Sequence, residues 1–113
     1  MFDILIEGGE VFDGTGSAGV QADVGVRDDR VVAVGSLRGA AARQTLDARG
    51  LAVAPGFIDI HTHSDFTLLV DGRADSQVCQ GVTTEVSGQC GFSAAPMGVN
   101  ADASHLIGYL DVG

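Results

Sequence analysis

Two histidines at the end of an apolar stretch are the residues of this chain best suited to chemistry. His61 and His63 follow residues 55–60, an apolar run with the character of a strand. Successive side chains of a strand point to opposite faces, so residues two apart share a face. The spacing therefore predicts that both imidazoles point the same way, with Asp59 behind them. Two imidazoles at one strand end can hold a metal ion of the zinc type.

Cys90 offers a third group of the same chemistry. It lies between Gly88 and Gly91, and glycines allow a tight loop that presents the intervening side chain. A thiolate is a strong zinc ligand, and histidine with cysteine is a zinc-type donor set. The other interpretation is a small buried hydrophobic residue, because free cysteines are commonly buried. The residue types and their positions leave both interpretations open.

Two aspartates next to the histidines have less definite roles. Asp59 has two interpretations: a carboxylate that orients a ligand histidine, or one that is hydrogen-bonded within the floor of the sheet for structural reasons. Asp65 follows the second histidine closely, and its residue type alone assigns it no role.

The first half of the chain, residues 1–54, has the pattern of short strands separated by glycine and aspartate turns. This pattern predicts a small antiparallel sheet that forms part of a β-sandwich. The expected elements are a hairpin of 2–7 with 10–12 that turns at Gly8 and Gly9, a hairpin of 22–27 with 31–34, a loop at 38–43, and strands at 45–47 and 51–54.

The second half, residues 55–113, alternates between strand and helix patterns, which predicts an α/β arrangement with parallel strands. The expected elements are strands at 57–63 and 82–86, a helix at 73–80 that starts from Asp71 and stops at Gly81, and a last helix that begins near Asn100 or Asp102. Ile58 and Ile60 are expected to face covering helices, and Cys79 to lie in the core. Active sites of such folds lie at the carboxyl ends of the strands.

Composition and charge argue against several classes of partner. The formal net charge of −9 disfavours nucleic acids and anionic membranes. The sequence lacks an apolar run of about 18 residues, the length that a membrane span needs. The first residues lack the basic segment of a secretory signal, and two cysteines do not make a disulfide framework. We therefore expect a cytoplasmic protein that acts on a small molecule, with no nucleic-acid or membrane partner.

Three stretches of the sequence together resemble one enzyme family. They are Val-Phe-Asp-Gly-Thr-Gly at 11–16, Pro-Gly-Phe-Ile-Asp-Ile-His-Thr-His-Ser-Asp at 55–65, and Gln-Gly-Val-Thr-Thr at 80–84 with Ser-Gly-Gln-Cys-Gly at 87–91. They resemble the N-acyl-D-amino-acid deacylases, or D-aminoacylases, of the amidohydrolase superfamily. The likeness runs from about residue 3 to Pro96. The last motif commonly reads Gly-Asn-Cys-Gly in that family, and Gln89 replaces the asparagine here.

The resemblance implies a fold, a metal site and a reaction. Residues 55–113 would form the first βα units of a metal-dependent (β/α)8 barrel, after the sandwich part at 1–54. His61, His63 and Cys90 would bind one or two zinc ions. The reaction would be hydrolysis of the linear amide bond of N-acyl-D-amino acids. In that family the general base and two further histidine ligands lie further along the chain, so we expect no catalytic base here.

The length of the chain suggests that it is part of a larger protein. A (β/α)8 barrel takes roughly 250 residues, and this chain has 113. We therefore expect the N-terminal portion of an enzyme, inactive alone, that associates with itself or with the remainder. One alternative is a cyclic-amide hydrolase of the dihydroorotase or hydantoinase type, which Cys90 disfavours because those enzymes more often use a lysine. The other is a non-catalytic truncated protein whose sheet serves assembly.

Overall fold

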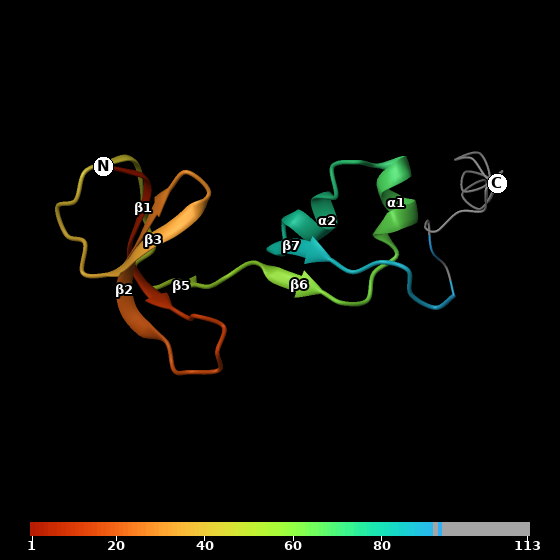
Figure 1. Cartoon of the computed structure of the whole chain (residues 1–113), viewed down its shortest axis with the longest axis horizontal. Coiled ribbons are helices and arrows are strands. Elements are labelled where there is room, and N and C mark those ends of the chain that lie inside the picture. The colour runs from red at the N-terminus through yellow and green to blue at the C-terminus, as the bar shows by residue number, and fades with distance from the viewer. Residues whose placement is uncertain (92, 94–113) are drawn as a thin grey trace. The chain divides into compact units, whose positions relative to one another are not determined.

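The structure, a computed structural model, describes residues 1–91 and 93. It is a mixed α/β chain that divides into two compact units, Met1–Pro55 and Gly56–Gly113 (Figure 1). The helix expected to begin near Asn100 lies outside the described residues. Within the described part, no helix has the length and apolar character that crossing a membrane requires.

The first unit is a five-stranded sheet built around its first strand. Its strands are β1 (Phe2–Val11), β2 (Val20–Arg27), β3 (Arg30–Gly35), β4 (Ala42–Asp47) and β5 (Ala52–Val53). The order is β3-β2-β1-β4, and β5 also pairs with β1. The most buried apolar side chains are those of Leu5, Val24 and Ala48. The central strand therefore supplies the middle of the small core.

The predicted hairpin at residues 2–12 is wrong, because β1 continues through both glycines. The pairing of β1 with β2 shifts in register between Ile6 and Gly9, and Gly8 has a φ of 70°. A Cβ atom on Gly9 would lie 2.5 Å from a methyl carbon of Val53. Two adjacent glycines here mark an irregularity in a strand, with close approach of a neighbouring strand, rather than a turn.

The expectation of an entirely antiparallel sheet is also wrong. β1 pairs antiparallel with β2, and β2 with β3, which confirms the predicted hairpin of 22–27 with 31–34. In contrast, β4 and β5 run parallel to β1. The loop after β3 returns the chain to the start of β1, where the backbone N–H of Phe2 donates to the carbonyl oxygen of Ala41 at 2.8 Å. Because β4 starts beside the start of β1, the two strands run in the same direction.

Asp23 ties the irregular part of β1 to the loop after β3. One of its carboxylate oxygens accepts a hydrogen bond from the backbone N–H of Gly8, and the other from that of Leu37, each at 2.8 Å. The bonds from Leu37 and then Gly8 stabilise the ionised form, and so they lower the pKa of Asp23. A single charged side chain thus holds two segments that have no ladder partner at these positions.

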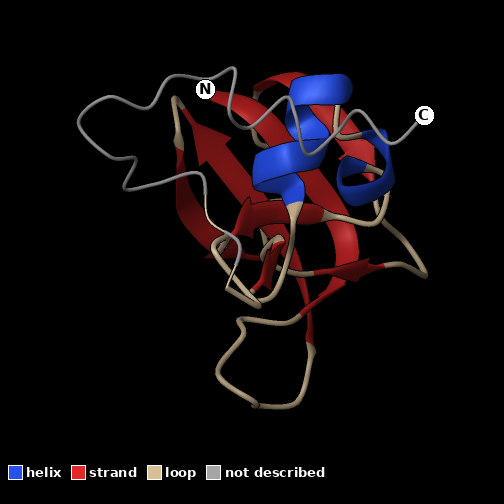
Figure 2. Ribbon diagram, turned by 90° about the vertical axis from the view of Figure 1, so that its right-hand side faces the viewer, coloured by secondary structure: helices blue, strands red, loops and turns tan. Residues whose placement is uncertain are grey.

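The second unit contains a two-stranded parallel sheet and two short helices (Figure 2). Its elements are β6 (Phe57–Asp59), α1 (Ser64–Val70), α2 (Asp75–Val78) and β7 (Val82–Glu85). The parallel pairing of β6 with β7 confirms the prediction of neighbouring parallel strands. The first of these strands ends at Asp59, however, so the two histidines lie just beyond it.

The helices of this unit differ from the sequence prediction. Asp71 does not cap α2, which starts from Ala74 with a φ of 51°. The carboxylate of Asp71 instead binds the guanidinium of Arg73 through two bonds of 3.0 and 2.9 Å, and this local ion pair competes with capping. Helix α1 was not predicted, because its short polar start lacks the apolar period of a helix.

Three apolar positions of the second unit are more exposed than the sequence suggested. The described helices leave Ile58 and Ile60 64% and 73% exposed. Cys79, expected in the core, is exposed because it lies at the carboxyl end of the four-residue helix α2. The apolar positions of this unit therefore lack cover within the described part of the chain.

The two bonds to Asp23 predict a pH-dependent effect of Asp23→Asn on stability. An asparagine oxygen can accept only one of the two bonds, so the variant should unfold at a lower urea concentration near neutral pH. A depressed pKa stabilises the fold above the ordinary value of 3.8, and this stabilisation is lost as the pH falls through the folded-state pKa. The difference between the urea midpoints of the two proteins should therefore shrink between about pH 6 and about pH 3.

The matched control is Asp29→Asn, which removes the same charge from an exposed turn. It should leave the midpoint almost unchanged at both pH values. A difference for Asp23→Asn that stays constant over this pH range would contradict the role assigned to its carboxylate.

Candidate metal centre

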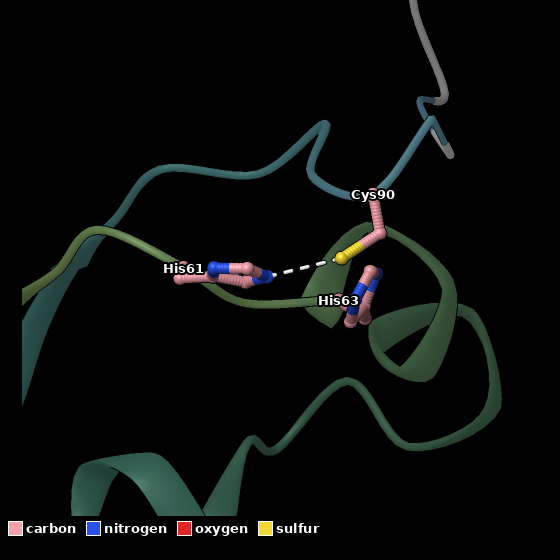
Figure 3. Close-up of side chains that lie close together, drawn as sticks. All are labelled: His61, His63 and Cys90. Atoms are coloured by element: carbon pink, nitrogen blue, oxygen red, sulfur yellow. Dashed lines mark hydrogen bonds between the residues drawn. The ribbon is translucent and has the colours of Figure 1, made fainter.

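His61, His63 and Cys90 lie together at one end of the second unit's sheet (Figure 3). Their candidate ligand atoms all lie within 4.8 Å of one another. The Nε2 atom of His61 is 3.2 Å from the Sγ atom of Cys90, within hydrogen-bonding distance. The centroids of the two imidazole rings are 5.9 Å apart, and the rings meet edge to face at 69°. All three side chains are exposed, so an ion and a small molecule could reach them.

The parallel pairing of β6 and β7 brings the two loops of this cluster together. Asp59 pairs with Glu85 at the ends of the two strands, and the backbone N–H of Val86 donates to the carbonyl oxygen of Asp59 at 2.8 Å. Parallel strands have their carboxyl ends at the same edge of a sheet. The loop that carries His61 and the loop that carries Cys90 therefore start side by side.

The alternation of a strand continues for a few residues beyond the end of β6. His61 and His63 are exposed, whereas Thr62 and Ser64 are 8% and 2% exposed. The histidines thus share the outer side, as the sequence spacing predicts. One carboxylate oxygen of Asp59 accepts a hydrogen bond from the backbone N–H of His61 at 3.0 Å. The carboxylate contacts the backbone of His61 rather than its imidazole ring.

Cys90 occupies a strained position in its loop. Its φ is 56°, and those of Gly88 and Gly91 are 88° and 78°. A left-handed conformation costs a residue with a Cβ atom roughly 1–2 kcal/mol. Such outliers persist where the surrounding structure fixes them, and they concentrate at functional sites. The thiol is exposed beside His61, so the interpretation of Cys90 as a buried hydrophobic residue is wrong.

Two buried carboxylates beside the cluster went unassigned in the sequence. Both oxygens of Asp65 and the Oε1 atom of Glu85 are buried, and the described residues give them no hydrogen-bond partner. A buried charged group without a partner is costly. In the sequence, Glu85 could have been noticed only because it is a charged residue at the end of a β-branched strand.

The donor set of the cluster fits zinc. Zinc binds imidazole nitrogens at about 2.0–2.1 Å and thiolate sulfur at about 2.3 Å, so ligand atoms around a tetrahedral ion lie roughly 3.3–3.6 Å apart. The distance of 3.2 Å between His61 and Cys90, and the limit of 4.8 Å for the whole set, are close to this requirement. Three protein ligands would leave one position of a tetrahedral ion open, as catalytic zinc sites do.

Comparisons with known proteins agree on one family. The model of the amidohydrolase family matches residues 44–108, which is more than half of the chain. The D-aminoacylase of Alcaligenes xylosoxydans xylosoxydans is 51% identical over 96 residues, which cover 85% of this chain and 20% of that enzyme. The chain therefore spans about a fifth of the length of this relative.

Two solved structures have the same fold over most of the chain. A D-aminoacylase with a binuclear metal centre, described in terms of one-metal activation and second-metal attenuation, has a TM-score of 0.80 and 50% identity over 86% of this chain and 20% of its own. The N-acyl-D-glutamate deacylase of Bordetella bronchiseptica, complexed with zinc and a phosphonate inhibitor, has a TM-score of 0.80 and 47% identity over 84% and 20%. By sequence and by structure, the chain belongs to the amidohydrolase family.

Proposed function

We propose that this chain is the N-terminal portion of a zinc-dependent enzyme that deacylates N-acyl-D-amino acids. The observation that carries the proposal is the meeting of His61, His63 and Cys90 at the carboxyl ends of two parallel strands. The 51% identity to a D-aminoacylase supports the choice of substrate class. A small-molecule substrate also agrees with a cluster that is exposed on one side.

The fold in this proposal is completed by other parts of a longer protein. Strands β6 and β7 would be the first two strands of a (β/α)8 barrel, and residues 1–54 would be part of a β-sandwich. Exposed apolar side chains support this, because Phe57, Ile58 and Ile60 are each more than 60% exposed. In the first unit, an apolar pocket of about 670 Å³ is lined by valines of several strands. Such surfaces call for cover by the remainder of the enzyme, or by a second copy.

The residues of this chain would hold one or two zinc ions and fix their place. When bound, zinc polarises a carbonyl oxygen and lowers the pKa of a coordinated water, as amide hydrolysis requires. Asp59 holds the backbone at His61, and the left-handed backbone of Cys90 places the thiol beside the imidazole. The general base that takes a proton from water would come from a segment beyond this chain.

The alternatives differ from this proposal in one testable property each. A cyclic-amide hydrolase would more often use a lysine where Cys90 lies, so the thiol favours a deacylase of linear amides. A non-catalytic assembly protein would not need three metal-binding side chains in one place.

The two free cysteines also suit a reducing cytoplasm, which would keep the Cys90 thiol available to a metal.

Zinc should protect Cys90, but not Cys79, from alkylation. Both thiols are exposed, so without metal both should react with iodoacetamide. Bound zinc should slow the reaction of Cys90 by at least about tenfold, because a coordinated thiolate is a weaker nucleophile. Peptide mass spectrometry measures both rates in one sample, and Cys79 is the internal control. Equal rates at both cysteines with zinc present would contradict the proposed ligand set.

In the full-length enzyme, Cys90→Ala should reduce both bound zinc and deacylation. The variant loses the one sulfur ligand, and we expect kcat/KM to fall by at least about tenfold. The matched control is Cys79→Ala, which removes an exposed thiol away from the cluster. Metal content and turnover of Cys90→Ala equal to those of the wild-type enzyme would refute the role of this cysteine.

The 113-residue chain alone, loaded with zinc, should not hydrolyse N-acyl-D-amino acids. It lacks the expected general base, and its exposed apolar strand residues should drive association. A deacylation assay and light scattering on the purified chain test both points. Turnover comparable to that of a full-length deacylase would overturn the view of the chain as a portion of an enzyme, and a stable monomer would overturn the argument from exposed surface.

A further inference from the structure

A buried chain of polar side chains lies behind the two histidines. The hydroxyl oxygens of Thr62 and Ser64 are 2.8 Å apart, and the backbone N–H of Ser64 donates to the Thr62 oxygen at 3.3 Å. The side-chain amide of Gln77 donates to the Ser64 hydroxyl oxygen at 3.4 Å. Thr62 and Ser64 are the two buried polar residues of the described part of the chain.

We propose that Thr62 and Ser64, linked to helix α2 through Gln77, are positioning residues for the metal ligands. The inference rests on the proposed zinc site and deepens it. In this view the two hydroxyls do not touch the metal or the substrate. They fix the direction in which His61 and His63 leave the backbone.

The histidines lie where the strand ladder no longer supports the backbone. β6 ends at Asp59, and α1 begins at Ser64. Residues 60–63 therefore form an irregular connection between the two elements. Exposed and buried side chains alternate along residues 61–64, so holding residues 62 and 64 on the inner side leaves the histidines on the outer side.

The hydroxyl contact between Thr62 and Ser64 is directional. A hydroxyl pair at 2.8 Å has the ordinary length of a strong O–H···O hydrogen bond. A buried hydroxyl that leaves its partner loses this bond without gaining one to water, so rotation of residues 60–63 is unfavourable. An apolar pair could fill the same space but would not select one orientation of the two side chains.

The chain of hydrogen bonds also joins the two segments that carry the cluster. Gln77 lies in α2, which directly precedes β7, and the loop after β7 carries Cys90. The bond from Gln77 to Ser64 therefore connects the stretch of His61 and His63 to the segment that leads to Cys90. At 3.4 Å this bond is the weakest link, and its contribution should be the smallest.

The test is a cobalt titration of the full chain and its variants. Co²⁺ replaces zinc in such sites and has visible bands that report ligand geometry, and a thiolate-to-cobalt band reports Cys90. We expect Thr62→Val to weaken Co²⁺ binding by about tenfold and to shift the visible bands. Thr62→Ser keeps the hydroxyl and should retain both properties. Thr67→Val, on the exposed side of α1, is the matched control and should bind like the wild type.

A second pair of variants tests the link to α2. Gln77→Ala should weaken Co²⁺ binding by a smaller factor, whereas Gln80→Ala should not, because that amide donates to the carbonyl oxygen of Ser76. If circular dichroism shows that Thr62→Val does not fold, the Gln77→Ala variant becomes the test, because Gln77 is only half-buried. Unchanged Co²⁺ affinity and unchanged visible bands in Gln77→Ala would then overturn the proposal.

The outcomes separate this inference from the proposed function. A wild-type chain that binds no Co²⁺ through Cys90 overturns the zinc site and this inference with it. A wild type that binds, together with a folded Thr62→Val of equal affinity and identical bands, overturns only the positioning role. Equal losses in Thr62→Val and Thr62→Ser would also overturn it, because the hydroxyl would then not be the cause.

Discussion

The parallel pairing of β6 with β7 is the constraint on which the cluster of His61, His63 and Cys90 depends. Hydrogen bonds close the pair at both ends, from Phe57 N–H to the carbonyl oxygen of Gly81 at 2.9 Å and from Val86 N–H to that of Asp59 at 2.8 Å. The side chain of Thr83 occupies the space where a Cβ atom of residue 56 would lie, so glycine fits at this position. A slip of one residue would reverse the faces of every side chain in the strand. A few backbone contacts therefore fix the register of β6 and β7. This register brings the imidazole of His61 and the thiol of Cys90 together.

The local sequence pattern predicted where strands lie better than it predicted which strands pair and in which direction. The alternation in 22–27 and the β-branched run at 82–86 gave strands that the structure contains. The direction of β4 was predicted wrongly, because it depends on a distant segment. β4 is parallel to β1 because of where the loop after β3 returns, and no residue of β4 encodes that. Adjacent glycines carry the same signal for a turn and for an irregular strand, and at Gly8 and Gly9 the pairing with β2 and with β5 decided between them.

The candidate site divides in the same way. The spacing of two histidines and a cysteine between glycines was visible in the sequence because it is local. The groups behind them were not, because a polar residue predicts exposure and Thr62 and Ser64 are buried. Ser64 is hydrogen-bonded to a helix more than ten residues away in sequence, through Gln77. Polar residues buried in pairs can be recognised only when both partners are placed in space.

Two features that cost stability lie in the second unit. Cys90 has a left-handed backbone, as Asp28 and Ala74 also do, and both oxygens of Asp65 and one oxygen of Glu85 are buried without hydrogen-bond partners among the residues described. A folded protein tolerates such departures where function requires them, and other contacts must offset the cost. Buried carboxylates are stabilised by donors or by positive charge. If the proposed function holds, donors from the remainder of a longer enzyme would supply the hydrogen bonds that these oxygens lack among the described residues.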